Sequence, residues 1–155
     1  MKNAFAVLFA LVFVCFQSQA QAPNLAALAK VKTAALVVHA TTSIACGDGS
    51  EGTCVRNDSE VVSKVKAFTD ATELWDHFEK ADATKADAIL EFTIKDASTT
   101  YGRISFSVRD ADSNTFLYFE SRDVVTLEND IVRIVNHLLK AVEDAKRKSS
   151  AVRKR

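Results

Sequence analysis

The sequence predicts an α+β domain of two layers, in which two helices cover an antiparallel three-stranded meander and one N-terminal strand. Residues 86–123 contain three short apolar-rich segments separated by two polar turns, which is typical of a meander. Apolar residues recur at steps of three and four in residues 57–76 and 126–144, which indicates a helix on each side of the meander. We expect one domain over residues 32–146.

Apolar and more polar residues alternate in the first two segments of the meander. A period of two places one set of side chains on one face of each strand, whereas a helix would need steps of three and four. The turn at residues 110–114 is rich in Asp, Ser and Asn, which bond their own backbone or accept a left-handed φ. The expected buried set is Ala88, Leu90, Phe92, Ile94, Ile104, Phe106 and Val108.

The third segment of the meander carries apolar residues on both faces. A period of two puts Phe116 and Tyr118 on one face and Leu117 and Phe119 on the other. Since one layer of helices covers one face only, the second face is expected to bind a protein partner or a second copy of the chain. We therefore predict Phe116 and Tyr118 as partner-binding residues. The alternative is that the first helix or the leader folds over this face.

The first predicted helix spans residues 57–76 and begins with a possible capping box of Asn57 and Glu60. A second box, Asp70 with Glu73, lies in the middle of this range. One continuous helix is the preferred interpretation. The alternatives are a break near Asp70, or a strand at residues 61–68 followed by a shorter helix.

The last predicted helix begins after Thr126, which can cap it, and carries one apolar stripe long enough to lie across the sheet. We expect this helix to pack on Phe92, Phe106 and Val108. Its stripe consists of Leu127, Ile131, Ile134, Val135, Leu138 and Val142.

A first strand is expected within residues 32–42, beside a meander strand and connected to it through the first helix.

Residues 1–20 have the pattern of a secretory signal peptide. Lys2 precedes an unbroken run of thirteen apolar residues, and small residues follow at the spacing of a cleavage site after Ala20 or Ala22. A membrane anchor is the alternative, but thirteen helical residues span only about 20 Å, less than the roughly 30 Å of a hydrocarbon core. We expect a secreted or periplasmic protein with a flexible leader at residues 21–31.

Cys46 and Cys54 are predicted to form a disulfide. They flank a loop that holds three of the four glycines, and an oxidising compartment favours the bond. A metal site that adds His39 is the alternative, but its ligand spacing is unusual for zinc, and a redox pair would need Cys-x-x-Cys. We expect no metal, and His39 is interpreted as a histidine of the first strand.

Basic residues gather at the C-terminus of a chain whose formal net charge is zero. Without Lys2 and this cluster, 13 basic residues face 20 acidic ones, a net charge of about −7 that disfavours nucleic-acid binding. The segment 147–155 is expected to be a mobile tail that contacts anionic surfaces, although a solvated helix end explains the pattern equally well. The cluster consists of Lys146, Arg147, Lys148, Arg153, Lys154 and Arg155.

No arrangement of residues points to catalysis or to a cofactor. The chain has no Gly-rich phosphate loop, and no Ser/His/Asp or Cys/His set has a supporting local context. We therefore predict a non-enzymatic binding or envelope-assembly domain. A small hydrolase or redox enzyme built on the cysteine loop and His39 is one alternative, and a secreted effector or inhibitor is another.

Residues 75–146 also resemble known envelope proteins. The segment KADAILEF, the turn RDADSNTFLY and the terminal amphipathic helix resemble small uncharacterised secreted bacterial domains and the N-terminal domain of TolB-like proteins. The cysteine loop, the basic tail and the lack of a following propeller depart from that pattern. The resemblance implies protein binding at the cell envelope rather than catalysis, and it supplies no functional residues.

Overall fold

The structure is a computed structural model that describes residues 24–46, 53–96 and 102–152. The expected signal peptide, the glycines of the cysteine loop, and Arg153, Lys154 and Arg155 lie outside the described residues. Among the described residues, no helix combines the length and the apolar composition needed to cross a bilayer. The elements in chain order are α1 (Leu25–Leu28), β1 (Thr33–Ala45), β2 (Thr53–Asn57), α2 (Ser59–Asp70), α3 (Leu74–His77), β3 (Glu79–Lys80), β4 (Ala88–Lys95), β5 (Arg103–Asp110), β6 (Phe116–Asp123) and α4 (Leu127–Val152).

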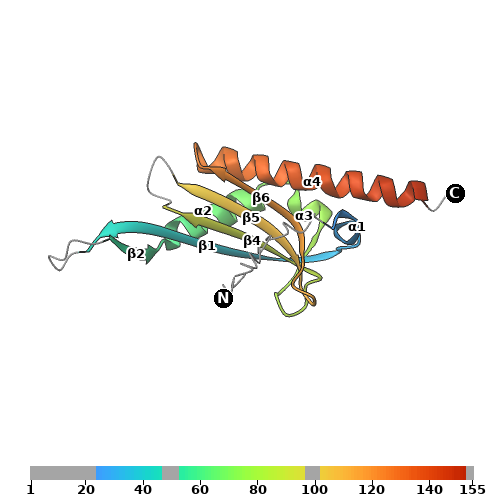
Figure 1. Ribbon diagram of the computed structural model, residues 1–155, viewed down its shortest axis with the longest axis horizontal. Coiled ribbons are helices and arrows are strands. Elements are labelled where there is room, and N and C mark those ends of the chain that lie inside the picture. Colours follow the sequence, from blue (N-terminus) through green and yellow to red (C-terminus); the bar gives the residue numbers. More distant parts are fainter. Residues whose placement is uncertain (1–23, 47–52, 97–101, 153–155) are drawn as a thin grey trace, which may run out of the picture.

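The strands form one mixed sheet in the order β2-β1-β4-β5-β6 (Figure 1). β3 pairs with the start of β1. The predicted α+β class and the β4–β5–β6 meander are confirmed. The first strand lies beside β4 as expected, and the two are parallel. The predicted architecture of four strands covered by two helices was wrong in detail, because the described residues form six strands and four helices. The prediction missed β2, β3 and α1, and it joined α2 and α3 into one helix. β2 has five exposed residues with no alternation, and β3 has two residues, so neither has a hydrophobic pattern.

The hydrophobic core lies between one face of the sheet and the helices. Phe92, Phe106 and Val108 are fully buried there together with Ile134 and Leu138 of α4, as the sequence predicted. The rings of Phe92 and Phe106 lie 4.5 Å apart between centroids. Each of the four helices in the described part of the chain contributes at least one buried side chain to this same cluster. The opposite face of the sheet is therefore not covered by any helix of the described residues.

Part of the segment expected to be a flexible leader belongs to the core. Asn24 caps α1, since its side-chain oxygen accepts a hydrogen bond of 3.1 Å from the Ala27 N–H. Leu28 is completely buried, and Val31 is nearly so. The small residues of this segment suggested a linker, but Leu25 and Leu28 are three residues apart and lie on one side of the short helix. The domain therefore includes residues before the predicted boundary at residue 32.

The first predicted helix is broken, as the alternative interpretation had it. α2 ends at Asp70, and α3 begins four residues later. The capping prediction was off by one residue, because Asp58 and not Asn57 accepts a hydrogen bond from the Val61 N–H, at 3.0 Å. That bond and a second one from the Thr42 hydroxyl hold the pKa of the Asp58 carboxyl below its ordinary value.

Helix α4 carries the predicted apolar stripe and extends further than expected. Ile131, Ile134, Val135 and Leu138 are fully buried. The helix continues to Val152, so residues 147–152 of the expected tail are helical. Lys146, Arg147 and Lys148 are exposed on this last part of the helix. Figure 1 shows α4 running along the β6 side of the sheet and the β1–β2 hairpin projecting at one end.

Candidate binding surfaces

The open face of the sheet carries an aromatic pair that the sequence did not assign correctly. Phe116 and Phe119 lie edge to face, with ring centroids 6.4 Å apart and ring planes at 78°. Phe116 stands opposite Arg109, and Phe119 stands opposite Ser107 on the neighbouring strand. Arg109 and Ser107 are two residues apart and share one face, so both phenylalanines lie on that face as well. We call Phe116 and Phe119 the aromatic pair.

A β-bulge brings the aromatic pair together. The register of β5 and β6 shifts between Val108 and Arg109, so that Leu117 is an extra residue of β6. The predicted pairing of Phe116 with Tyr118 on one face was therefore wrong. Leu117 is only 1% exposed, and Tyr118 packs its ring against Phe106 on the core side, with centroids 6.1 Å apart. Phe116 and Phe119 are 44% and 60% exposed.

A charged cluster lies beside the aromatic pair on the same face. The Arg109 guanidinium donates to the Glu91 carboxylate and, over 3.1 Å, to the Asn114 side-chain oxygen. His39 Nε2 lies 3.6 Å from the other oxygen of Glu91. A shallow hollow of about 160 Å³ separates this cluster from the phenylalanines. Phe106 and three small hydroxyl side chains also line this hollow, namely those of Thr93, Ser105 and Ser107.

The predicted disulfide is present. Cys46 and Cys54 are bonded, with Cα atoms 5.3 Å apart, and they close the β1–β2 hairpin near its tip. A disulfide indicates an oxidising compartment outside the cytoplasm. His39 is seven residues before Cys46 in an extended strand, which corresponds to a separation of about 23 Å at 3.3 Å per residue. The structure therefore does not bring His39 and the cysteines together, as the alternative enzyme would require.

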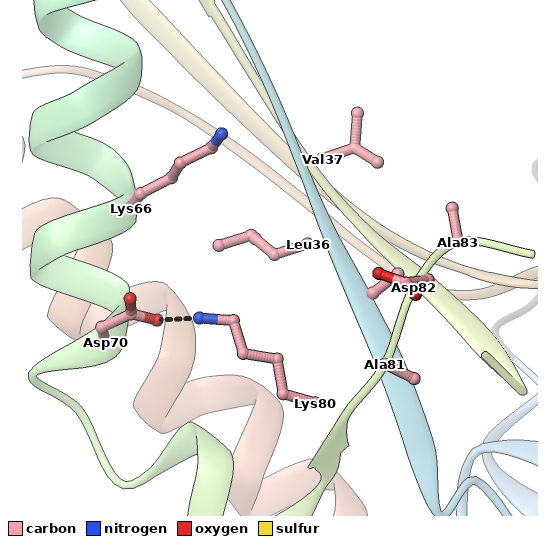
Figure 2. A pocket seen from close by; sticks show the side chains of 9 residues that line it. Leu36, Val37, Lys66, Asp70, Lys80, Ala81, Asp82 and Ala83 are labelled. Atoms are coloured by element: carbon pink, nitrogen blue, oxygen red, sulfur yellow. Dashed lines mark hydrogen bonds and ion pairs between the residues drawn. The ribbon is translucent and has the colours of Figure 1, made fainter. Parts of the chain in front are cut away.

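A groove follows the edge of β1 that lies toward α2 (Figure 2). Its volume is about 320 Å³. Asp70 accepts hydrogen bonds of 2.9 Å from Lys80 and 2.8 Å from the Trp75 indole N–H. The bond from Lys80, more than that from Trp75, holds the pKa of the Asp70 carboxyl below its ordinary value. No sequence pattern indicates this groove, because its position depends on where β2 and β3 pair with β1.

A polar network joins the core side of β6 to α4. Glu120 accepts a 2.8 Å hydrogen bond from the Tyr118 hydroxyl, lies 3.2 Å from His137 Nδ1, and forms an ion pair of 3.3 Å with Arg122. Arg122 also lies 3.6 Å from Asp130. Burial first, and then the bond to Glu120, raise the pKa of the Tyr118 hydroxyl above its ordinary value. This network fixes the helix on the sheet, so Tyr118 has a structural role on the core side.

Within the described part of the chain, no group of three or more His, Cys, Asp or Glu side chains is arranged to hold a metal ion. Comparison with protein families found no matching family model, and no curated protein matches the chain.

Similar solved structures have low sequence identity. The protein XCC0632 from Xanthomonas campestris, of the family model DUF330, is 9% identical, with a TM-score of 0.39 over 77% of this chain and 88% of that chain. PelC from Paraburkholderia phytofirmans, solved as a dodecamer, is 10% identical, with a TM-score of 0.38 over 72% of this chain and 86% of that chain. A variant of PelC is similar to the same degree. The resemblance of residues 75–146 to TolB-like domains stays an expectation.

Proposed function

We propose that the protein is a non-enzymatic binding domain, secreted or periplasmic, which binds a protein partner or a second copy of itself through the open face of β5 and β6. The observation that carries this proposal is the aromatic pair. Two large apolar rings are exposed side by side on a sheet face that no described helix covers.

The surroundings of the aromatic pair fit a protein interface. Protein interfaces combine an apolar centre, enriched in aromatic side chains, with a polar rim. Here Phe116 and Phe119 supply the apolar centre, and the Arg109–Glu91 ion pair supplies charge at its margin. The small side chains of Ser105 and Ser107 leave the surface between them low, so a partner side chain can contact the rings from the side.

The expected location supports the same class of function. The Cys46–Cys54 disulfide is suited to an oxidising compartment, and the signal peptide expected at residues 1–20 would deliver the chain there. The resemblance to TolB-like domains implies envelope-assembly roles that depend on protein contacts. The charged cluster around Glu91 is held together by its own ion pairs, which favours a structural margin over a reaction centre.

The experiment compares the wild-type protein with a variant in which the aromatic pair is removed, F116S/F119S. Each protein is immobilised and exposed to the extracytoplasmic fraction of its native source, and each is examined by light scattering for self-association. We expect the wild type to retain a specific protein or to dimerise. The variant should lose that association, because interface free energy is concentrated in a few aromatic residues.

The matched control is V125S/V132S, which removes two exposed apolar side chains away from the aromatic pair. Val125 is 89% exposed in the turn before α4, and Val132 is 37% exposed on α4. This control should associate like the wild type. Equal association by all three proteins would contradict the proposed binding surface, and so would a monomeric wild type that retains nothing.

A further inference from the structure

β1 has a stretch of unoccupied edge between two short strands. On one side, β4 pairs with β1 continuously from Ala34 to Thr41. On the other side, β3 pairs only with Thr33 and Ala34, and β2 pairs only from Thr41 onward. Residues 35–40 therefore have no neighbouring strand on this side within the described residues. The interruption is six residues long, or about 20 Å at 3.3 Å per residue.

The hydrogen bonds at both ends of this interruption show which backbone groups are directed into it. The carbonyl of Ala34 accepts from the Ala81 N–H, and the carbonyl of Ala40 accepts from the Asp58 N–H, both at 2.9 Å. The carbonyl of Thr33 instead accepts from Asp87, beside β4. The direction of the backbone N–H and C=O groups alternates along a strand. These groups therefore point toward the interrupted edge in the even-numbered residues of β1.

Leu36 and Val38 are the even-numbered residues within the interruption. Their N–H and C=O groups make no backbone hydrogen bond on this side with any described residue. Four such groups in a row are a template for another strand. The strands β3 and β2 also limit the length of a strand that could be added to this edge. Only about four residues fit between them without displacing either.

The groove of about 320 Å³ lies along this edge. Figure 2 shows Leu36 reaching toward α2 and the Lys66 side chain extending from α2 toward β1. Lys80 is neutralised by Asp70 and lies over the Trp75 ring, 5.0 Å from its centroid. Lys66 has no ion pair or hydrogen bond with any described residue. Asp70 attracts the Lys66 ammonium electrostatically, and Asp82 lines the groove from the segment after β3. Lys66 is nevertheless the lysine of the lining that is not held in an ion pair, so it is available to the carboxylate of an occupant.

We propose that this edge of β1 binds an extended segment of a partner protein, about four residues long, that carries a Glu or Asp side chain on its α2 side. The segment adds a strand to the sheet, and its backbone bonds the N–H and C=O groups of Leu36 and Val38. Its carboxylate pairs with Lys66. This site lies on β1 and is independent of the aromatic pair on β6.

Amide hydrogen exchange of the full chain tests whether the edge is open. The amides of Leu36 and Val38 should exchange faster than those of Val37 and His39, which lie in the ladder with β4. Equal protection of all four amides would mean that another part of this chain already fills the edge, and it would overturn the proposal.

A peptide titration followed by amide chemical shifts tests the occupant. The probes are the blocked tetrapeptides Ac-Val-Glu-Val-Thr-NH2 and Ac-Val-Lys-Val-Thr-NH2. We expect the Glu peptide to shift the amides of Leu36 and Val38 and to bind about fivefold more tightly than the Lys peptide. Lys66→Glu should reverse this preference. Lys66→Ala should abolish it, and this second variant serves as the test if the charge reversal impairs folding. Lys140→Glu, on the exposed side of α4, is the control and should keep it.

Two results would overturn the proposal. One is the absence of shifts at Leu36 and Val38 with either peptide at millimolar concentration. The other is an unchanged preference in both Lys66 variants, which would mean that a different cation selects the carboxylate. Because F116S/F119S leaves this edge intact, that variant should bind the Glu peptide like the wild type. The two proposals therefore fail separately.

Discussion

Phe116 and Phe119 lie edge to face on one surface of the sheet, although residues three apart in a regular strand are on opposite faces. The extra residue that makes this possible is Leu117, which enters the core at the bulge opposite Val108 and Arg109. A bulge of this kind redirects side chains without interrupting the strand. In this domain, its result is an aromatic surface that regular pairing would have divided between the two faces.

Because of the bulge, truncation of Leu117 should lower the free energy of unfolding much more than truncation of Phe119. Leu117→Ala should lower the free energy of unfolding by about 2 to 5 kcal/mol, because it leaves a cavity at a fully buried position. Phe119→Ala should lower it by about 1 kcal/mol or less, since this ring is 60% exposed. Urea unfolding of both variants measures the difference. A larger loss for Phe119→Ala would show that β6 has the regular register.

The disulfide is expected to stabilise the hairpin modestly. Closing a loop with a sequence separation of 8 contributes about 2 to 3 kcal/mol in the chain-entropy model. Cys46→Ser/Cys54→Ser should therefore lower the free energy of unfolding by about that amount while the remaining sheet stays folded. The intact mass before and after reduction is the direct check. An unchanged mass on reduction, with both thiols free in the native protein, would contradict the bond.

The carboxylate of Asp87 is expected to stabilise the fold at neutral pH and to lose this contribution in acid. Its carboxylate accepts backbone hydrogen bonds of 2.9 Å from Thr33 and 3.0 Å from Lys32, which hold its pKa below the ordinary value. A carboxyl with a lowered pKa in the folded state stabilises the protein above about pH 4, the ordinary range of the unfolded chain. This contribution disappears as the pH falls through the folded pKa.

Urea unfolding at several pH values measures this contribution. Asp87→Asn should be less stable than the wild type by about 1 kcal/mol at pH 7, and the difference should shrink below pH 4. Asp144→Asn is the control, since Asp144 is exposed on α4 and no described residue bonds its side chain. A constant difference between Asp87→Asn and the wild type from pH 7 to pH 2 would contradict the assignment.

The basic end of α4 is expected to be dispensable for the fold. Residues 146–151 are exposed, although they are helical. Removing residues 149–155 should leave the melting temperature almost unchanged, because the buried stripe of the helix ends at Ala145. Binding to anionic liposomes at low salt should weaken in the truncated chain if the basic cluster contacts such surfaces. A marked fall in melting temperature would show that the helix end contributes to packing.

The parts of the fold with strong local patterns were predictable from the sequence. Alternation identified β4 and β5, and the apolar stripe identified α4, because each pattern reports directly which face is buried. The two-residue strand β3 and the exposed strand β2 carry no such pattern. The bulge at Leu117 was missed for a related reason: a period of two assumes one residue opposite each partner. The groove beside Leu36 depends on the lengths of β2 and β3, which only tertiary pairing determines.

The free energy of unfolding of F116S/F119S shows whether the aromatic pair is a surface for binding or part of the core. Since both rings are about half exposed or more, we expect this free energy to fall by about 1 to 2 kcal/mol, mainly through the loss of their mutual contact and partial burial. A loss above about 4 kcal/mol, comparable with truncation of a buried aromatic residue, would instead place both rings in the core.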